Sequence, residues 1–334
     1  MTRDTEKSLR KSQVFDQVSS QATPRNKKRK GKLHSREKYP QFLILRKPFS
    51  PQHHNFLPTV MILIAYSEKD TAGTNIAKKV MENCKFNKAT EIFQDNPVFA
   101  AKINERPVKI VTLREETIYA QNLPDQFSDL DLVVFLSRHS SASGTPTLSV
   151  HAPGNFSAAE LGGLPQTLSV CPAESMCTAL KTLDDLRREM QLDYEVSYEC
   201  THHGPSLSVP TMFVELGSSP AQWSDLKASE AVAKAAMAAI CNFGFSSRNA
   251  VLGIGGPHYN KRFTEMALKG KARFGHMIPK YAIHSVTVDL LRQSMEKTVE
   301  KVNLAILDWK GIRGLDKAHI LRALKEVDLP YKKV

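Results

Sequence analysis

A continuous apolar run is followed directly by three polar residues in the stretch Asp131-Leu132-Val133-Val134-Phe135-Leu136-Ser137-Arg138-His139. An apolar run of this kind is typical of a β-strand that is covered on both faces, as strands of parallel sheets are. Seven further stretches are expected to form strands, at residues 59–65, 108–113, 147–150, 194–200, 211–216, 250–254 and 304–307.

Amphipathic stretches between these runs predict helices, at residues 71–83, 173–190, 220–242, 263–269, 286–302 and 316–327. Asp70, Ser219 and Asp316 are expected to cap the first, third and last of these helices, and Pro220 suits a first helical position. The alternation of strands and helices predicts a single α/β domain at residues 59–334. Its fold class is α/β, with a mostly parallel (mixed) sheet and helices on both faces.

The positive charge of the chain is concentrated at its N-terminus. The formal net charge is +12, and residues 1–58 hold 14 Lys or Arg against 4 Asp or Glu. Because blocks of like charge repel and stay solvated, we expect this basic N-terminal extension to be disordered. It is an arm that gathers RNA phosphates, a localisation signal or a tail without a specific role; alternatively, translation starts at Met61.

The remaining composition favours a cytoplasmic protein. The five cysteines form no CxxC pair, and their odd number does not suit a disulfide framework. No stretch approaches the roughly 18 consecutive apolar residues of a membrane-spanning helix, and the N-terminus lacks the apolar stretch of a secretory signal. We expect no membrane interaction, and no obligate protein partner is evident.

Histidines follow several of the predicted strands. His139 follows the strand at 131–136, His202 and His203 follow the strand at 194–200, and His258 follows the strand at 250–254. Because ligands of open α/β sheets bind outside the carboxyl ends of strands, we expect these imidazoles to meet at one edge of the sheet. A lone histidine is more commonly a hydrogen-bonded structural residue, so the hypothesis rests on their convergence.

These residue types suit a zinc hydrolase. Imidazole is a good zinc ligand, and a catalytic zinc needs three protein ligands and an open position, although no HExxH motif identifies the ligands here. We expect catalytic roles for His202, His203 and His258, and metal ligation by His139, His151, Glu215 and His276. Glu199 and Glu215 are alternatively a general base, a group that fixes a histidine tautomer, or members of structural ion pairs.

A glycine-rich turn, Leu-Gly-Ile-Gly-Gly-Pro-His-Tyr at 252–259, follows one predicted strand. It does not fit the dinucleotide-binding fingerprint, because His258 stands where the third glycine belongs. The backbone amides of Gly255 and Gly256 are expected to hold an anion or an ester oxygen, and Arg138 a phosphate or carboxylate. The alternative is a tight structural turn.

A basic stretch lies close to His258 in the sequence. It either cradles an RNA backbone or forms a solvated helix face, and its members are Lys261, Arg262, Lys269, Lys271 and Arg273.

Five ordered blocks resemble the D-aminoacyl-tRNA deacylase family of the archaeal and plant type. They are Phe-Leu-Ser-Arg-His at 135–139, Leu-Ser-Val-His at 148–151, Thr-His-His-Gly-Pro at 201–205, Pro-Thr-Met-Phe-Val-Glu-Leu-Gly-Ser at 210–218, and the glycine-rich turn at 252–259. The similarity spans residues 59–327, whereas the basic extension departs from the family pattern.

The resemblance implies hydrolysis of the ester that joins a D-amino acid to the 3′ end of tRNA, with tRNA charged with a D-amino acid as the partner. It also implies a zinc ion (Zn2+) as cofactor and a fold similar to peptidyl-tRNA hydrolases and nucleoside phosphorylases. Three other classes stay open: a zinc-dependent hydrolase of peptides or acylated small molecules, a nucleoside phosphorylase, and an RNA-binding protein without catalysis. The clustered imidazoles argue against the last.

Overall fold

The computed structural model describes residues 61–127, 129–244 and 248–334, which fall within one compact unit at residues 56–334. The expectations for the basic extension at residues 1–58 lie outside the described residues. Within the described part of the chain, no helix has the length and apolar character needed to cross a bilayer.

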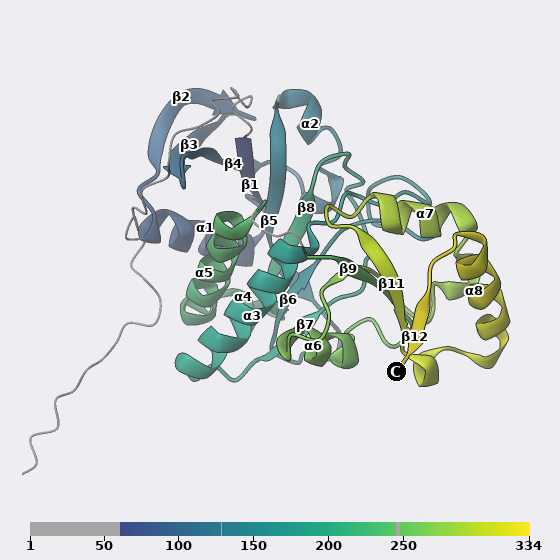
Figure 1. Cartoon of the computed structure of the whole chain (residues 1–334). Helices are drawn as coiled ribbons and strands as arrows, with labels where there is room; N and C mark the ends of the chain where they lie inside the picture. The colour runs from purple at the N-terminus through teal and green to yellow at the C-terminus, as the bar shows by residue number, and fades with distance from the viewer. Residues whose placement is uncertain (1–60, 128, 245–247) are drawn as a thin grey trace, which may run out of the picture. The chain divides into compact units, whose positions relative to one another are not determined.

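The strands form two sheets, one with the order β2-β3-β4-β1-β5-β8-β6-β7 and one with the order β10-β9-β11-β12 (Figure 1). The first sheet comprises β1 (Met61–Ser67), β2 (Asn87–Phe93), β3 (Asn96–Ile103), β4 (Arg106–Leu113), β5 (Leu130–Ser140), β6 (Thr147–His151), β7 (Glu195–Tyr198) and β8 (Thr211–Ser218). The second comprises β9 (Ala250–Ile254), β10 (Phe274–Ile278), β11 (Val302–Leu307) and β12 (Tyr331–Lys333).

The α-helices are α1 (Thr71–Asn83), α2 (Leu123–Gln126), α3 (Ala173–Glu189), α4 (Pro220–Trp223), α5 (Leu226–Asn242), α6 (Lys261–Leu268), α7 (Val288–Glu296) and α8 (Gly314–Glu326). Three short 3₁₀ helices are η1 (Thr117–Tyr119), η2 (Ile283–Ser285) and η3 (Trp309–Gly311).

Most strand pairs are parallel, as predicted. In the first sheet β1 pairs in parallel with β4 and β5, β5 with β8, and β6 with β7, whereas β3 pairs antiparallel with β2 and β4, and β6 with β8. The second sheet is parallel throughout its described pairs. The mostly parallel α/β fold is therefore confirmed, although its strands divide between two sheets.

Helices and loops cover the two faces of the first sheet differently. The long helices α1, α3 and α5 pack together on one face (Figure 1). The opposite face carries a hydrophobic core built around Leu63, Phe135 and Phe213. Leu123 of α2 and Leu207 of the loop before β8 pack against this core. On this second face a short helix and a loop therefore take the place of the long helices.

Helix caps decide where several helices begin. Asp70 caps α1 as predicted, since its Oδ1 accepts a hydrogen bond from the Gly73 amide at 2.9 Å. The single helix expected at 220–242 is two helices, because Asp225 caps α5 by accepting from the first amides of that helix. The prediction for Asp316 is wrong: it lies inside α8, and its carboxylate pairs with Arg313.

Candidate functional site

Strand direction places three predicted site residues on one face of the first sheet. His139 lies within β5 and pairs with Gly217 of β8, whereas His151 ends β6 and pairs with Phe213 at the other end of β8. Glu215 stands between them on β8. Because side chains two residues apart on a strand point to the same face, the two imidazoles flank the Glu215 carboxylate. The imidazoles predicted from the sequence do not share one carboxyl edge of the sheet, because β6 and β7 run opposite to β5 and β8; they come together over this face instead.

The chain that follows β7 brings the second sheet to this face. Glu199 forms a β-bridge with Tyr259, and the Cys200 amide donates to the carbonyl oxygen of His258 at 2.9 Å. The next amide, of Thr201, donates to the carbonyl of Met277 in β10. The loop after β9 therefore delivers His258 to the same place as the histidines that follow β7.

Five imidazoles and two carboxylates form one cluster. The ring centroids of His202 lie 4.4 Å from His151, 4.2 Å from His203 and 4.3 Å from His258. Within the described residues, three groups of side chains offer ligand atoms that lie within 4.8 Å of one another: His151 with His202 and His203, Glu199 with His202 and His258, and His139 with Glu199 and Glu215.

Glu199 and Glu215 are buried carboxylates whose charge the imidazoles balance. Oε2 of Glu199 lies 2.9 Å from Nε2 of His258, and its Oε1 lies 3.2 Å from Nδ1 of His139. Burial alone would raise the pKa of Glu199, but the His258 hydrogen bond and the nearby imidazoles hold that pKa well below its usual range. Burial lowers the pKa of His139, but the Glu215 hydrogen bond and the Glu199 charge outweigh it, so the net shift of its pKa is upward.

His202 and His203 are held in the neutral form, in contrast to His139, whose pKa is raised. Backbone carbonyls accept from their Nδ1–H groups, at 2.9 Å from Cys200 and 2.7 Å from Gly204, so each Nε2 keeps its lone pair. Burial and the neighbouring imidazole of His151 lower the pKa of His203 to about 4, and burial with the imidazoles of His203 and His151 holds the pKa of His202 well below its usual value. Both rings are therefore neutral at pH 7, the form that binds a metal or accepts a proton.

The cluster opens into a cavity of about 330 Å³. Arg138 lines this cavity, but its guanidinium already donates to Glu116 at 2.9 Å and to the carbonyl of Lys69 at 3.3 Å. The other polar lining residues include Ser137, His139, His202, His203, Glu215, His258 and Tyr259. The expected catalytic histidines thus face one hollow, together with Arg138.

Three predicted site residues lie elsewhere or are engaged. His276 is buried outside the cluster, with Nδ1 at 3.0 Å from the Thr201 hydroxyl and Nε2 near two backbone carbonyls, so its role is to hold the chain before His202. The amides of Gly255 and Gly256 donate to the carbonyls of Ile278 and Gly311. They have no hydrogen left for an anion, which corrects that prediction in favour of a structural turn.

Two tyrosines join the site without having been predicted for it. The Tyr259 hydroxyl lies 2.6 Å from Nε2 of His139, and the Tyr281 hydroxyl lies 3.2 Å from Nδ1 of His258. Burial raises the pKa of each phenol to about 12, so both stay protonated. Tyr259 directly follows His258 in the sequence, so its place in the site could have been predicted. Tyr281 reaches the site only through the packing of the second sheet, which the sequence does not show.

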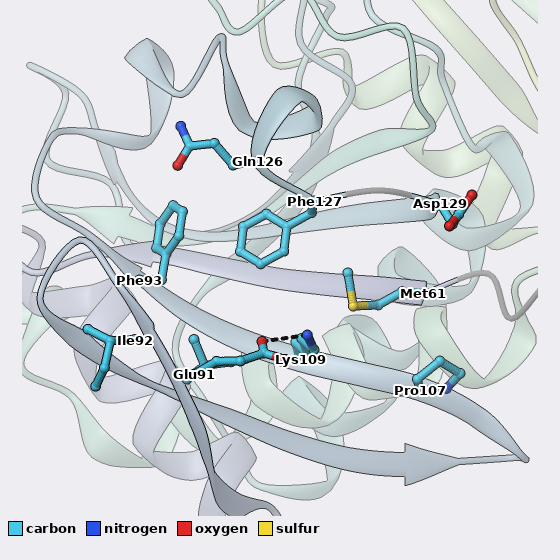
Figure 2. Close-up of a pocket in the computed structure, with 10 residues that line it drawn as sticks. Met61, Glu91, Ile92, Phe93, Pro107, Lys109, Gln126, Phe127 and Asp129 are labelled. Atoms are coloured by element: carbon cyan, nitrogen blue, oxygen red, sulfur yellow. Dashed lines mark hydrogen bonds and ion pairs between the residues drawn. The ribbon is translucent and has the colours of Figure 1, made fainter.

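A separate cavity of about 450 Å³ lies between the first sheet and α2 (Figure 2). Its walls include Met61 and the pair Phe93 and Phe127, whose ring centroids are 5.0 Å apart. An ion pair between Lys109 and Glu91 crosses its floor. Its described lining contains no histidine, cysteine or serine, so the chemistry gathers at the imidazole cluster instead.

Comparison with known proteins agrees with this site. Residues 126–332 match the family model described as D-aminoacyl-tRNA deacylase. The D-aminoacyl-tRNA deacylase of Thermococcus kodakarensis is 35% identical over 277 residues, which cover 81% of this chain and 99% of the relative. That of Ignicoccus hospitalis is 38% identical over 223 residues, which cover 65% and 89%.

A crystal structure described only as a conserved protein of unknown function has a TM-score of 0.73 and 29% identity to this chain, covering 82% of this chain and 95% of the other. The family model covers more than half of the chain, and the Thermococcus relative is matched over nearly its whole length. The chain therefore belongs to the D-aminoacyl-tRNA deacylase family.

Proposed function

We propose that this protein hydrolyses the ester bond between a D-amino acid and the 3′ end of tRNA, releasing the free D-amino acid and the tRNA. The observation that carries the proposal is the cavity lined by neutral His202 and His203 and by His258, whose ring is held from behind by the buried Glu199 carboxylate. Ester hydrolysis needs a positioned base and a group that polarises the carbonyl, and this cluster offers both. A cytoplasmic location suits an enzyme that acts on tRNA and belongs to the proposal.

The donor set also fits a zinc ion. Both ring nitrogens of His151 are buried without a hydrogen-bond partner, with the Glu215 carboxylate 3.6 Å from Nε2, although buried polar atoms in proteins almost always have such a partner. We assign the ion to His151, His202 and His203, because three imidazoles with an open position are a ligand set of catalytic zinc. When bound, zinc supplies Lewis acidity toward the ester carbonyl. This set differs from the expected one, in which His139 and Glu215 were ligands: both lie in the group with Glu199.

His258 is the general base in this proposal. Its Nε2–H donates to Glu199, which leaves Nδ1 on the side of the exposed Tyr281 hydroxyl. A water molecule that takes the place of this hydroxyl loses a proton to Nδ1 while its oxygen adds to the ester carbonyl. The buried charge of Glu199 stabilises the imidazolium that forms. The ester C–O bond then breaks, and His258 returns the proton to the ribose oxygen.

His139 and Tyr259 have a positioning role. His139 lies between two carboxylates, and its Nε2 holds the Tyr259 hydroxyl at 2.6 Å. Since Tyr259 and Arg138 both line the cavity, this contact fixes one wall of the space that the aminoacyl group enters.

Release of D-tyrosine and of L-tyrosine from charged tRNA, each with and without a zinc chelator, tests the proposal. We expect rapid release of the D-amino acid only, and loss of that release after chelation. Equal rates on both enantiomers would overturn the proposal. Uncharged tRNA should compete; if it does not, the alternative of a zinc-dependent hydrolase of peptides or acylated small molecules is favoured.

A further inference from the structure

A groove of about 540 Å³ runs along α6, which packs against β7. Tyr259 lines both this groove and the cavity of the imidazole cluster, so the two hollows share a wall. The groove has four cationic side chains, and these are Lys261, Arg262, Lys269 and Lys271.

Carboxylates offset these cations only in part. Lys261 lies 3.2 Å from Glu195, Arg262 lies 3.3 Å from Asp308, and Lys269 lies 2.8 Å from Glu265. Lys261, Lys269 and their carboxylate partners are largely exposed, and such surface pairs contribute little free energy, so a phosphate can replace the carboxylate at these two lysines. Among the described residues, Lys271 has no carboxylate in ion-pair contact.

The cationic surface continues beyond Asp308 along the carboxyl ends of the second sheet. Trp309 follows β11, and the Nζ atoms of Lys317 and Lys333 lie 4.6 and 3.9 Å from its ring centroid. Exposed Lys280 follows β10, and its amide donates to the carbonyl of Gly256 in the turn before His258. Loops at the carboxyl ends of parallel strands are a common place for ligands, and cations interleaved with aromatic rings suit nucleic acid.

We infer that this surface, the α6 groove with Lys280, Lys317 and Lys333, binds the ribose-phosphate backbone of the tRNA acceptor end. The backbone leads the 3′ ester past Tyr259 into the imidazole cluster. This inference rests on the proposed function, because that function places the end of an RNA strand in the adjoining cavity. RNA fits better than an acidic peptide, since aromatic rings stand among the cations, and RNA offers both bases that stack and one charge per nucleotide.

The test is the binding of fluorescently labelled, uncharged tRNA at several salt concentrations, measured by anisotropy. The variant Lys269→Glu/Lys271→Glu should bind at least tenfold more weakly. The slope of log affinity against log salt should fall by about 1.4–1.8 for two lost phosphate contacts, at roughly 0.7 per contact on a single strand and 0.9 on a duplex. A matched control, Lys78→Glu/Lys227→Glu, reverses two exposed lysines on α1 and α5 and should bind as the wild type does.

Wild-type affinity and salt slope in the α6 variant would overturn the inference, as would an equal loss in the control. If the melting temperature of the first variant differs from that of the wild type, the charge-neutralising variant Lys269→Gln/Lys271→Gln is used in its place. Hydrolysis of a short D-aminoacyl-adenosine should be unchanged in the α6 variant, while KM for the full D-aminoacyl-tRNA rises. The wild-type protein could bind tRNA, and the α6 variant lose that binding as expected, while neither hydrolyses D-aminoacyl-tRNA. This result would reject the proposed function but keep the binding surface.

Discussion

Nε2 of His258 lies 2.9 Å from Oε2 of Glu199, although the two residues are 59 positions apart and follow strands of different sheets. Glu199 is fully buried, so water cannot replace the imidazole as its partner. The contact therefore both joins the two sheets at the site and fixes the orientation of the His258 ring.

Removing the charge of Glu199 should remove most of the activity. Glu199→Gln keeps the side-chain shape but no longer stabilises an imidazolium at His258, so kcat should fall by about 10²–10⁴, the contribution of general-base catalysis. Single-turnover release of D-tyrosine from charged tRNA measures this loss. Glu230→Gln, a change at an α5 residue that pairs with Lys234, should keep the wild-type rate. A Glu199→Gln enzyme with wild-type kcat would rule out a role of Glu199 in supporting His258 as the general base.

Zinc content should depend on the three clustered histidines. His203→Asn removes one proposed ligand, and the zinc retained per chain after dialysis should drop by at least tenfold, since three ligands are the usual minimum for a catalytic site. Atomic absorption measures this directly, without reference to activity. His284→Asn, at an exposed histidine, is the matched control and should retain the metal. Equal zinc in both variants would contradict the assignment.

Gly217 should tolerate no side chain. A Cβ at this position would lie 2.6 Å from the Cβ of His139, because β8 and β5 pair at these two residues. Gly217→Ala should lower the free energy of unfolding by about 1–3 kcal/mol through overpacking, and should displace His139. Urea denaturation measures the first effect. Gly314→Ala, where no atom lies within 4 Å of the added Cβ, should leave stability unchanged or raised.

Stability should fall in mild acid through His276. Burial lowers the pKa of this histidine from 6.5 to about 4, so the unfolded chain takes up a proton between these pH values that the folded chain does not. The associated stability is complete above pH 6.5 and is lost as the pH falls toward 4, by roughly 3 kcal/mol at 1.36 kcal/mol per pH unit. His276→Gln should be less stable at pH 7 but should show a flatter pH dependence.

Thermal melting between pH 4.5 and 7.5 measures that dependence. His284→Gln should reproduce the wild-type profile because this side chain is exposed. If the His276→Gln profile is as steep as that of the wild type, another group accounts for the loss of stability in acid.

The apolar runs of β5, β8 and β9 were found from sequence because burial on both faces leaves a local pattern that needs no knowledge of partners. β10 was missed although it is buried throughout, because Gly275 and His276 interrupt its apolar run. Strands with few buried residues were also missed. β2, for example, is polar and exposed along most of its length, and its pairing with β3 lies at the edge of the sheet.

The sequence by itself determined the residue types of the site, the ordered blocks that carry the family resemblance, and the capping of α1 by Asp70. These are local properties, since composition, spacing and a three-residue hydrogen bond are written within short segments. Only the tertiary structure decided that β6 runs against β8, that the site lies on a sheet face, and that Tyr281 belongs to it while His276 supports it from outside. Strand direction and the use of a hydrogen-bonding group depend on partners far along the chain, which no short segment contains.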